Sequence, residues 1–264
     1  MKKQTFLVLA LSSAIAGASA AEPCPGNADA LGTERTISVD AATTPRVGRK
    51  QFPQTLPLAA KEVVLTFDDG PWPGTTRRVL EALAHECVKA TFFMLGRNAE
   101  AHPELARAVR VAGHAVGHHT YAHRLLDRIP LAAAEAEINH GVAAIERALS
   151  GAAAATPSLP VAPFFRFPGF ASRPELLDRL EKRQVVVFGT DFWASDWVRM
   201  SPHAELGLVL ARLHTAGWGI LLLHDTKQQT AAMLPNLLRE LKRQGYRIVQ
   251  AVPAGPNSAL LPPP

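Results

Sequence analysis

The sequence predicts an α/β protein with a parallel sheet, arranged either as a β/α barrel or as a doubly wound sheet. Two observations predict this class. Apolar runs of strand length alternate with helical patterns about seven times over roughly 190 residues, as expected of consecutive β/α units. Several of these runs also end directly at a charged residue or a histidine, and parallel β/α folds build their active sites at the carboxyl ends of their strands.

The N-terminal segment predicts export. Lys2-Lys3 precede an apolar stretch over Phe6–Ile15, and a small-residue cleavage site follows at Ala18–Ala20. We interpret residues 1–20 as a secretory signal peptide, because the apolar stretch is too short to span a bilayer. We therefore expect a periplasmic or secreted protein without a membrane span.

Composition and periodicity divide the rest of the chain. Residues 21–60 are rich in Pro, Thr, Gly and Ala and predict a leader that wraps the domain, with one short strand at Thr36–Val39. The domain itself is expected over residues 61–253, followed by a disordered tail over 254–264. The net charge of +5 includes the two signal lysines, and no Lys/Arg cluster follows them, so we expect no nucleic-acid partner.

The first strand of the domain is predicted over Val63–Phe67, a short continuous run of β-branched and aromatic residues. It stops at Asp68 and Asp69, and Gly70-Pro71 then turns the chain. Because Asp-Gly is a common turn pair, the two carboxylates alone would indicate only a polar exit from the sheet. Adjacent carboxylates repel each other, however, and are best tolerated where a cation or an arginine holds them ionised. A cation site is therefore the second interpretation.

The later elements follow from periodicity and breaker residues. The clearest helix is Leu131–Ser150, where four apolar residues from Ile138 to Leu149 recur along one face. Pro235 is expected in the first turn of the last helix, where proline is tolerated. Small residues over Gly151–Pro163 predict a linker. The other predicted helices are Arg77–Cys87, Pro103–Ala112, Pro174–Lys182, His203–Ala216 and Pro235–Gln244, and the other predicted strands are Ala90–Leu95, His114–Gly117, Phe164–Phe165, Val185–Gly189, Ile220–Leu223 and Tyr246–Val249.

The chain has two cysteines, Cys24 and Cys87. They could be unrelated, one in the leader and one buried in a helix. An even number of cysteines in an exported chain favours a disulfide, since disulfides persist outside the cytosol. Such a bridge would close a loop of 63 residues.

A metal site is indicated by histidines close in sequence. His119 and His123 are four residues apart, a spacing that brings two side chains to one side of a helical turn. A histidine-rich loop without a ligand is the alternative. Two imidazoles and one carboxylate also hold zinc and other first-row metals, with a coordination position left open for water or substrate. Asp69 is the candidate third ligand.

Four charged or titratable residues lie just after an apolar run: Asp68, Arg166, Asp191 and His224. Taken singly, each is commonplace at the end of a strand. In a parallel β/α sheet, all strands open their carboxyl ends on one face. The sequence therefore predicts that these residues converge on one pocket beside the metal group.

Five motifs resemble, in order and spacing, those of the NodB-homology polysaccharide deacetylases, which form carbohydrate esterase family four. The resemblance covers about Glu62 to Val252 and implies a distorted parallel β/α barrel of about seven units. It also implies one divalent metal ion, usually zinc, with cobalt, iron or nickel as alternatives. The motifs are Thr66-Phe67-Asp68-Asp69-Gly70-Pro71, His119-Thr120-x-x-His123, Arg166-x-Pro168, Asp196-Trp197 and Leu222-x-His224.

The resemblance also implies roles. Asp69, His119 and His123 are the expected metal ligands. Asp68 is the expected general base and His224 the expected general acid.

Four further residues are expected to support them. Arg166 would orient Asp68 and lower its pKa, and Asp196 would raise the pKa of His224. Trp197 and Leu222 would form the walls of the groove that receives the acetyl methyl group.

The third and second motifs depart from the family pattern. The third usually reads Arg-x-Pro-aromatic-Gly, and here Gly169 precedes Phe170. The backbone N–H that helps to bind the oxyanion is then expected from Gly169, with the aromatic wall displaced or lost. In the second motif, His118 replaces the usual asparagine. Both departures bear on substrate preference more than on chemistry.

The expected function is removal of acetyl groups from glycans that contain N-acetylglucosamine, such as chitooligosaccharide or peptidoglycan. The alternatives are an O-deacetylase of the acetylxylan type, a hydrolase of small amides, and a glycan-binding protein without turnover. The expected partner is an acetylated glycan substrate.

Overall fold

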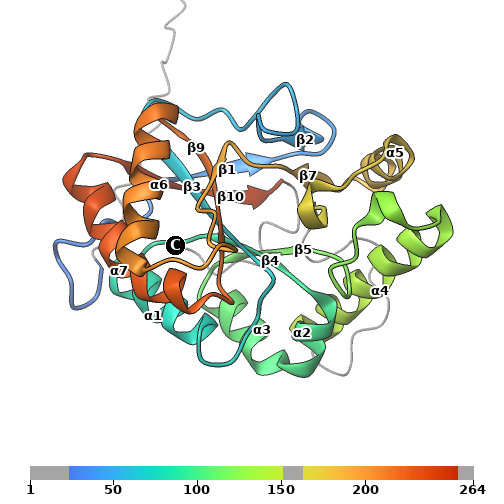
Figure 1. The fold of residues 1–264 in the computed structure, drawn as a ribbon, viewed down its shortest axis with the longest axis horizontal. Helices are drawn as coiled ribbons and strands as arrows, with labels where there is room; N and C mark the ends of the chain where they lie inside the picture. Colours follow the sequence, from blue (N-terminus) through green and yellow to red (C-terminus); the bar gives the residue numbers. More distant parts are fainter. Residues whose placement is uncertain (1–23, 151–162, 255–264) are drawn as a thin grey trace, which may run out of the picture.

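A computed structural model describes residues 24–150 and 163–254 (Figure 1). The predicted signal peptide over residues 1–20 lies outside the described residues. So do all but the last residue of the predicted Gly151–Pro163 linker and all but the first residue of the predicted tail. Among the helices that are described, none has the length and apolar character needed to cross a bilayer.

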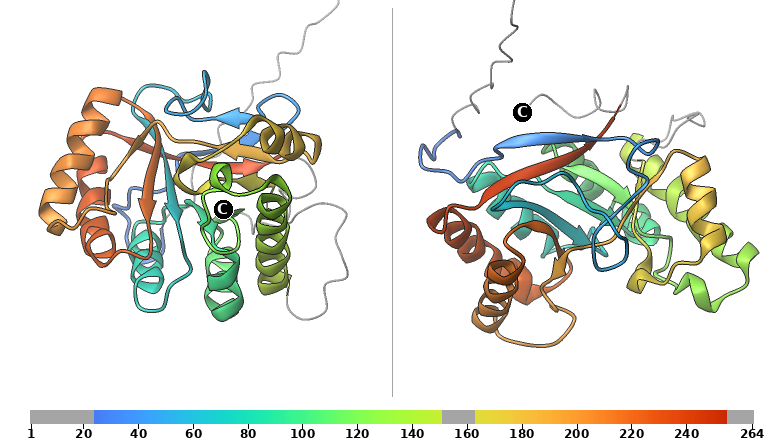
Figure 2. Two further views of the ribbon diagram at one scale, coloured as in Figure 1. Left: turned by 45° about the vertical axis from the view of Figure 1, so that its right-hand side comes forward. Right: turned by 90° about the horizontal axis from the view of Figure 1, so that it is seen from above.

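The centre of the molecule is a parallel sheet that curves into a distorted barrel (Figures 1 and 2). Every strand pair in the described part of the chain is parallel. The main path runs β9-β3-β4-β5-β6-β7, with β8 beside β9 and β2 beside β7. β10 lies beside the start of β3, and β1 lies beside β10. The predicted α/β class with parallel strands is confirmed. The strands are β1 (Arg35–Val39), β2 (Arg46–Val47), β3 (Glu62–Asp68), β4 (Thr91–Met94), β5 (Ala115–His118), β6 (Phe164–Phe165), β7 (Val186–Phe188), β8 (Phe192–Trp193), β9 (Gly219–His224) and β10 (Arg247–Pro253).

Helices cover the outside of the sheet, with α6 and α7 on one flank and α4 and α5 on the other (Figure 1). The bounds of α4, α5 and β6 are those predicted. The sequence analysis missed α2, β2 and β8, because elements of six and two residues are too short to show a period. The helices are α1 (Thr76–His85), α2 (Gly96–Ala101), α3 (Pro103–Val111), α4 (Leu131–Ser150), α5 (Pro174–Lys182), α6 (Pro202–Ala216) and α7 (Gln228–Arg243).

The predicted start of the last helix was wrong. α7 begins at Gln228, so Pro235 lies inside the helix rather than in its first turn. An interior proline costs about 3 kcal/mol, because it removes a backbone donor and crowds the preceding turn. The apolar face continues on both sides of the proline, and its burial offsets that cost. The fully buried apolar residues of this helix are Met233, Leu234, Leu237, Leu238 and Leu241.

Alternation along β3 separates two cores. Val63, Leu65 and Phe67 face the helices and belong to the large outer cluster. Val64 faces the barrel interior, in a cluster that includes Phe93, Phe164, Phe188 and Ile220. Since side chains alternate along a strand, Thr66 and Asp68 also face inward, above this apolar floor. The interior is therefore apolar in its depth and polar at the carboxyl ends of the strands.

Residues 24–60 lie against the barrel. β1 pairs with β10, and β2 pairs with β7. Ile37, Val39, Val47 and Leu56 are buried in the same interior cluster as Val64. This segment therefore supplies strands and core side chains to the domain, and it lies along the outside of the barrel strands (Figure 2).

A disulfide joins Cys24 to Cys87, the residue that follows α1 by two positions. Nearby hydrogen bonds hold the same two segments together. The Gly32 N–H donates to the Glu86 carbonyl at 2.8 Å, and the Leu31 N–H donates to the Glu86 carboxylate at 2.9 Å. The bridge therefore reinforces a docking that backbone contacts also make.

Replacing both cysteines by serine should lower the free energy of unfolding by up to about 4 kcal/mol, because the unfolded chain regains the entropy of a closed loop. Urea unfolding of the native protein and the double variant measures the difference. The native protein should show no free thiol on alkylation. Two freely alkylating thiols in native protein would contradict this prediction.

Candidate active site

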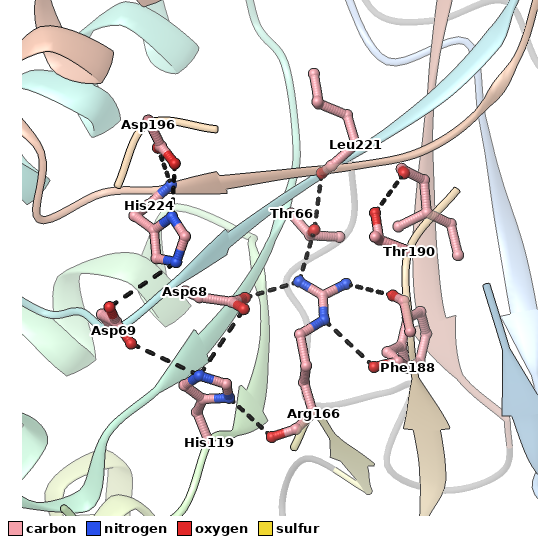
Figure 3. A network of polar contacts seen from close by, with 12 residues as sticks. Thr66, Asp68, Asp69, His119, Arg166, Phe188, Thr190, Asp196, Leu221 and His224 are labelled. Atoms are coloured by element: carbon pink, nitrogen blue, oxygen red, sulfur yellow. Dashed lines mark hydrogen bonds and ion pairs between the residues drawn. The ribbon is translucent and has the colours of Figure 1, made fainter. Parts of the chain in front are cut away.

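Strand register brings distant motif residues together at one end of the barrel (Figure 3). Asp68 at the end of β3 is level with His224 at the end of β9. On the other side, His118 at the end of β5 is level with Phe165 at the end of β6, so His119 and Arg166 continue at the same height. Four strands thereby deliver four side chains to one place.

Arg166 is the most buried charge of this group, with none of its surface exposed. Its guanidinium donates to Asp68 Oδ1 at 2.7 Å and to Thr66 Oγ1 at 2.9 Å. It also donates to the carbonyls of Phe188 and Gly189 at 3.3 and 2.8 Å (Figure 3). A buried charge is tolerated when it is paired and its donors are satisfied, and Arg166 meets both conditions.

The pKa of Asp68 is raised, although Arg166 alone would lower it. Burial raises the pKa of Asp68, and the positive charges of Arg166 and His224 oppose that rise without cancelling it. Arg166 does lower the pKa of Asp68, as the sequence predicted, but the loss of water around a carboxyl that is 2% exposed is the larger effect, so the net shift is upward. The arginine orients this carboxyl, and burial makes it the more basic.

Asp69, His119 and His123 offer three ligand atoms that lie within 4.8 Å of one another. Asp69 Oδ1 is 3.6 Å from His119 Nε2 and 3.5 Å from His123 Nε2. This oxygen is buried and has no hydrogen-bond partner among the described residues. Two imidazoles and a carboxylate that converge around an unpaired buried oxygen fit a divalent first-row metal.

The tautomer of His119 suits this arrangement. The Arg166 carbonyl accepts a hydrogen bond from His119 Nδ1 at 2.7 Å, which leaves Nε2 unprotonated to face Asp69. Burial lowers the pKa of His119 to about 3, so the imidazole is neutral near pH 7. His123 is more open, with 38% of its side chain exposed.

Local backbone geometry places Asp69. The residue has a φ of 76°, which turns its carboxylate out of the strand direction. The Asn98 side-chain amide donates to the Asp69 carbonyl at 2.7 Å and holds the turn. Gly70 follows because a Cβ there would lie 2.2 Å from the carboxylate of Asp225.

His224 and Asp196 form a second buried pair. Asp196 Oδ1 accepts from His224 Nδ1 at 2.7 Å, and Asp196 Oδ2 accepts from the His224 backbone N–H at 2.7 Å. Burial alone would lower the pKa of His224. The hydrogen bond and negative charge of Asp196, with Asp68 and Asp69 nearby, outweigh burial and raise it to about 9. The direction is the one expected from the sequence.

The remaining predicted residues surround these pairs. Trp197 is 52% exposed, and its ring is 6.0 Å from that of His224. Leu222 is buried and lies level with Thr66 on the inward face. Gly169 is exposed and has a φ of 56°. Phe170, which takes the displaced aromatic position, lies 6.5 Å from Trp193 between ring centres.

The prediction that Asp191 joins the pocket was wrong. Its carboxylate accepts from the backbone and side chain of Arg49, from Thr55 and from the Ile220 N–H. All four donors are structural, and they fasten the segment before β3 to the start of β9. A strand end carries catalytic residues only when it faces the pocket, and the apolar run could not show which way Asp191 points.

Comparisons with known proteins agree with this geometry. The sequence profile described as polysaccharide deacetylase matches residues 56–185. A peptidoglycan-N-acetylglucosamine deacetylase of Bacillus cereus is 31% identical over 199 residues, which cover 74% of this chain and 88% of that protein. The chain belongs to the polysaccharide deacetylase family. The predicted family and its barrel fold are both confirmed.

Other members of the family are longer. Peptidoglycan-N-acetylmuramic acid deacetylase PdaC of Bacillus subtilis is 29% identical over 197 residues, 74% of this chain and 39% of that protein. The structure of the Bdellovibrio bacteriovorus peptidoglycan deacetylase Bd3279 superposes with a TM-score of 0.73 at 31% identity, over 87% of this chain and 63% of that one. The chain thus spans less than two thirds of each of these two deacetylases.

Several residues that position the candidate site by hydrogen bonds were not predicted from the sequence. Thr66 accepts from Arg166, Asn98 holds the Asp69 carbonyl, and Thr230 Oγ1 lies 2.8 Å from Asp196 Oδ2. Thr66 could have been found, because period-two alternation puts it on the same face as Asp68. Asn98 and Thr230 sit on helices far along the chain and carry no local signal.

Arg166→Met should lower the free energy of unfolding by about 3–5 kcal/mol, because it leaves a buried carboxylate without its partner. Arg46→Met is the matched control. Arg46 pairs with Asp178 and Glu181 at the surface, where an ion pair contributes about 0–1 kcal/mol. Equal losses in urea unfolding of the two variants would show that burial of the Arg166 pair has no special weight.

His123→Ala should lower the metal content, because it removes one of the three candidate ligands. Metal content of protein purified with and without added zinc measures the change, and the unaltered protein should hold one ion per chain. The control is His203→Ala, at an exposed histidine on α6. A His123→Ala protein that retains metal at the level of the unaltered protein would refute the assignment of His123.

Proposed function

We propose that the protein is a metal-dependent hydrolase that removes acetyl groups from N-acetylglucosamine-containing glycans, either chitooligosaccharide or peptidoglycan. One observation supports this most strongly. Two titratable groups flank the Asp69–His119–His123 group: His224 Nε2 is 3.9 Å from Asp69 Oδ2, and Asp68 Oδ2 is 3.9 Å from His119 Nε2. Metal-assisted hydrolysis of an amide uses a general base and a general acid on either side of the metal site.

Asp69, His119 and His123 are the proposed ligands of one divalent ion. Zinc suits two imidazoles and a carboxylate best, with cobalt, iron or nickel as alternatives. When bound, the ion supplies a water of lowered pKa and polarises the substrate carbonyl.

Asp68 is the proposed general base. Arg166 occupies its Oδ1, so Oδ2 is the oxygen left to accept a proton from the attacking water. Burial raises the pKa of this carboxyl, which strengthens it as a base.

His224 is the proposed general acid. Its Nδ1 is bound to Asp196, so a proton on Nε2 faces the reacting group. With a pKa raised to about 9, the imidazole carries that proton near neutral pH. An amine leaves poorly as an anion, and protonation by His224 lets it depart neutral.

Three further residues complete the proposed site. The Gly169 N–H would donate to the oxyanion, and Trp197 and Leu222 would line the groove for the acetyl methyl group. The assignment of Gly169 rests on motif position, whereas Trp197 also lies beside His224 and Leu222 also lies opposite Thr66.

The displaced aromatic residue favours a second candidate. Phe170 lies toward Trp193 rather than at the family position, so the wall of the sugar site differs. An O-deacetylase of the acetylxylan type or a small-amide hydrolase therefore remains the alternative, ahead of a glycan-binding protein without turnover. Acetate release from chitin oligomers, peptidoglycan and acetylxylan, with and without chelator, separates them. Metal-dependent release from acetylxylan alone would overturn the N-deacetylase proposal.

The proposed setting is outside the cytosol, periplasmic or secreted. The disulfide between Cys24 and Cys87 supports it, because disulfides persist in oxidising compartments. The deacetylase domain is proposed over residues 61–253, and the family profile matches most of its first two thirds.

Asp68→Asn should retain metal and lose activity on every acetylated substrate by a factor of about 10²–10⁴, because water must be deprotonated whatever the leaving group. Acetate release and metal content are measured on the same preparation. An Asp68→Asn protein with unchanged activity would remove Asp68 from the mechanism.

His224→Ala should also retain metal, but its loss should depend on the leaving group. Activity on N-acetyl glycans should fall by about 10²–10⁴, whereas an activated aryl acetate, whose phenolate leaves unprotonated, should lose far less. Rates on both substrates are compared in one buffer. Equal losses on the amide and the aryl ester would show that His224 is not the acid.

A further inference from the structure

A buried glutamate lies behind the His224–Asp196 pair. Glu205, in the first turn of α6, has none of its surface exposed. Among the described residues no cation lies within ion-pair distance of its carboxyl group, and its Oε2 has no hydrogen-bond partner. A carboxylate in this setting is costly, whereas the neutral acid is tolerated.

Thr230 joins this glutamate to Asp196. Its Oγ1 is 2.9 Å from Glu205 Oε1 and 2.8 Å from Asp196 Oδ2. A hydroxyl has one hydrogen, so it can donate to only one of these two oxygens. The other contact is a hydrogen bond only if the carboxyl group itself carries a proton.

Asp196 is not the protonated partner. Both of its oxygens already accept from His224, one from the backbone N–H and one from Nδ1, each at 2.7 Å. An acceptor of this kind is an ionised carboxylate. The proton therefore belongs on Glu205.

Two other influences on Glu205 can be weighed. The helix N-terminus favours an anion, but the Ala204 and Glu205 N–H groups donate to Ser201 instead of to this carboxyl. Burial raises the pKa of Glu205 to about 7, and the Asp196 charge adds to the rise, whereas the Thr230 hydrogen bond and the His224 charge oppose it. The balance agrees with the hydrogen-bond geometry.

We propose that the Glu205 carboxyl group is protonated and donates a hydrogen bond to Thr230, whose hydroxyl in turn donates a hydrogen bond to Asp196. Glu205 and Thr230 are then positioning residues for His224. Asp196 is then held by three donors and cannot turn away from the imidazole. His224 keeps its Nδ1 proton on Asp196 and presents Nε2 to the reacting group. The effect on catalysis rests on the proposed role of His224 as the acid.

The position of the proton is tested without substrate. Infrared spectra in D₂O at mildly acidic pH should show protonated-carboxyl absorption, to which the buried Asp225 also contributes, and Glu205→Gln should lose one component of it. The matched control is Glu62→Gln. Glu62 is also buried, but Arg35 lies 2.7 Å away and lowers its pKa, so this variant should keep that component. Spectra of the unaltered protein and Glu205→Gln that match in the carboxyl region would overturn the proposal.

The positioning role is tested by leaving-group dependence. Thr230→Val should lower activity on an N-acetyl glycan about tenfold or more, as loss of an outer support usually does, and spare an activated aryl acetate. Thr230→Ser keeps the hydroxyl and should restore the ratio of amide to ester rates. Thr91→Val is the matched control, because Thr91 is buried in β4 and its hydroxyl has no partner among the described residues. Equal effects on amide and ester, or no effect on either, would overturn the role.

The outcomes separate this inference from the proposed function. If the unaltered protein releases no acetate from any glycan, the proposed function fails, and the infrared comparison still decides where the proton lies. If the unaltered protein is active and Thr230→Val keeps its ratio of amide to ester rates, the positioning role fails and the proposed function stands.

Discussion

The site depends on one interaction, the burial of the Arg166 guanidinium inside the barrel. A charge without exposed surface must have its donors satisfied, and here Thr66, Asp68, and the carbonyls at the end of β7 accept them. The backbone carbonyl of Arg166 accepts a hydrogen bond from His119 Nδ1. Arg166 therefore orients a carboxylate with its side chain and an imidazole with its carbonyl, and it couples the two halves of the pocket.

The surroundings of Asp68 and His224 raise the pKa of each group for a different reason. Asp68 loses water on burial, which raises its pKa. The Arg166 charge opposes that rise without cancelling it and fixes the orientation of the carboxyl group. His224 also loses water, but an anion in direct contact more than compensates. Outside this pair, Thr230 and Glu205 continue the network away from the pocket. Hydrogen bonds therefore run from the pocket through Asp196 to Thr230 on α7 and Glu205 on α6.

The sequence predicted what is encoded locally. The strand that ends at Asp68 is marked by a continuous apolar run and the helix Leu131–Ser150 by its periodicity, and the structure has both. What failed depends on contacts between distant segments. Pro235 sits inside α7 because tertiary burial outweighs its local penalty. Asp191 follows an apolar run as Asp68 does, yet it turns to Arg49. Orientation at a strand end is decided by packing, which an apolar pattern does not record.

The sheet topology has a consequence for the order in which the chain can fold. β3 is among the first strands of the chain, yet along its length it pairs with β9, from Val63 opposite Gly219 to Asp68 opposite His224. β1 pairs with β10, the last strand, through Arg35 opposite Val249. Contacts so distant in sequence form slowly, because loop closure precedes any gain from pairing. During synthesis, the barrel cannot close until its C-terminal strands have emerged. Until then, β3 has no partner at the edge that β9 later fills.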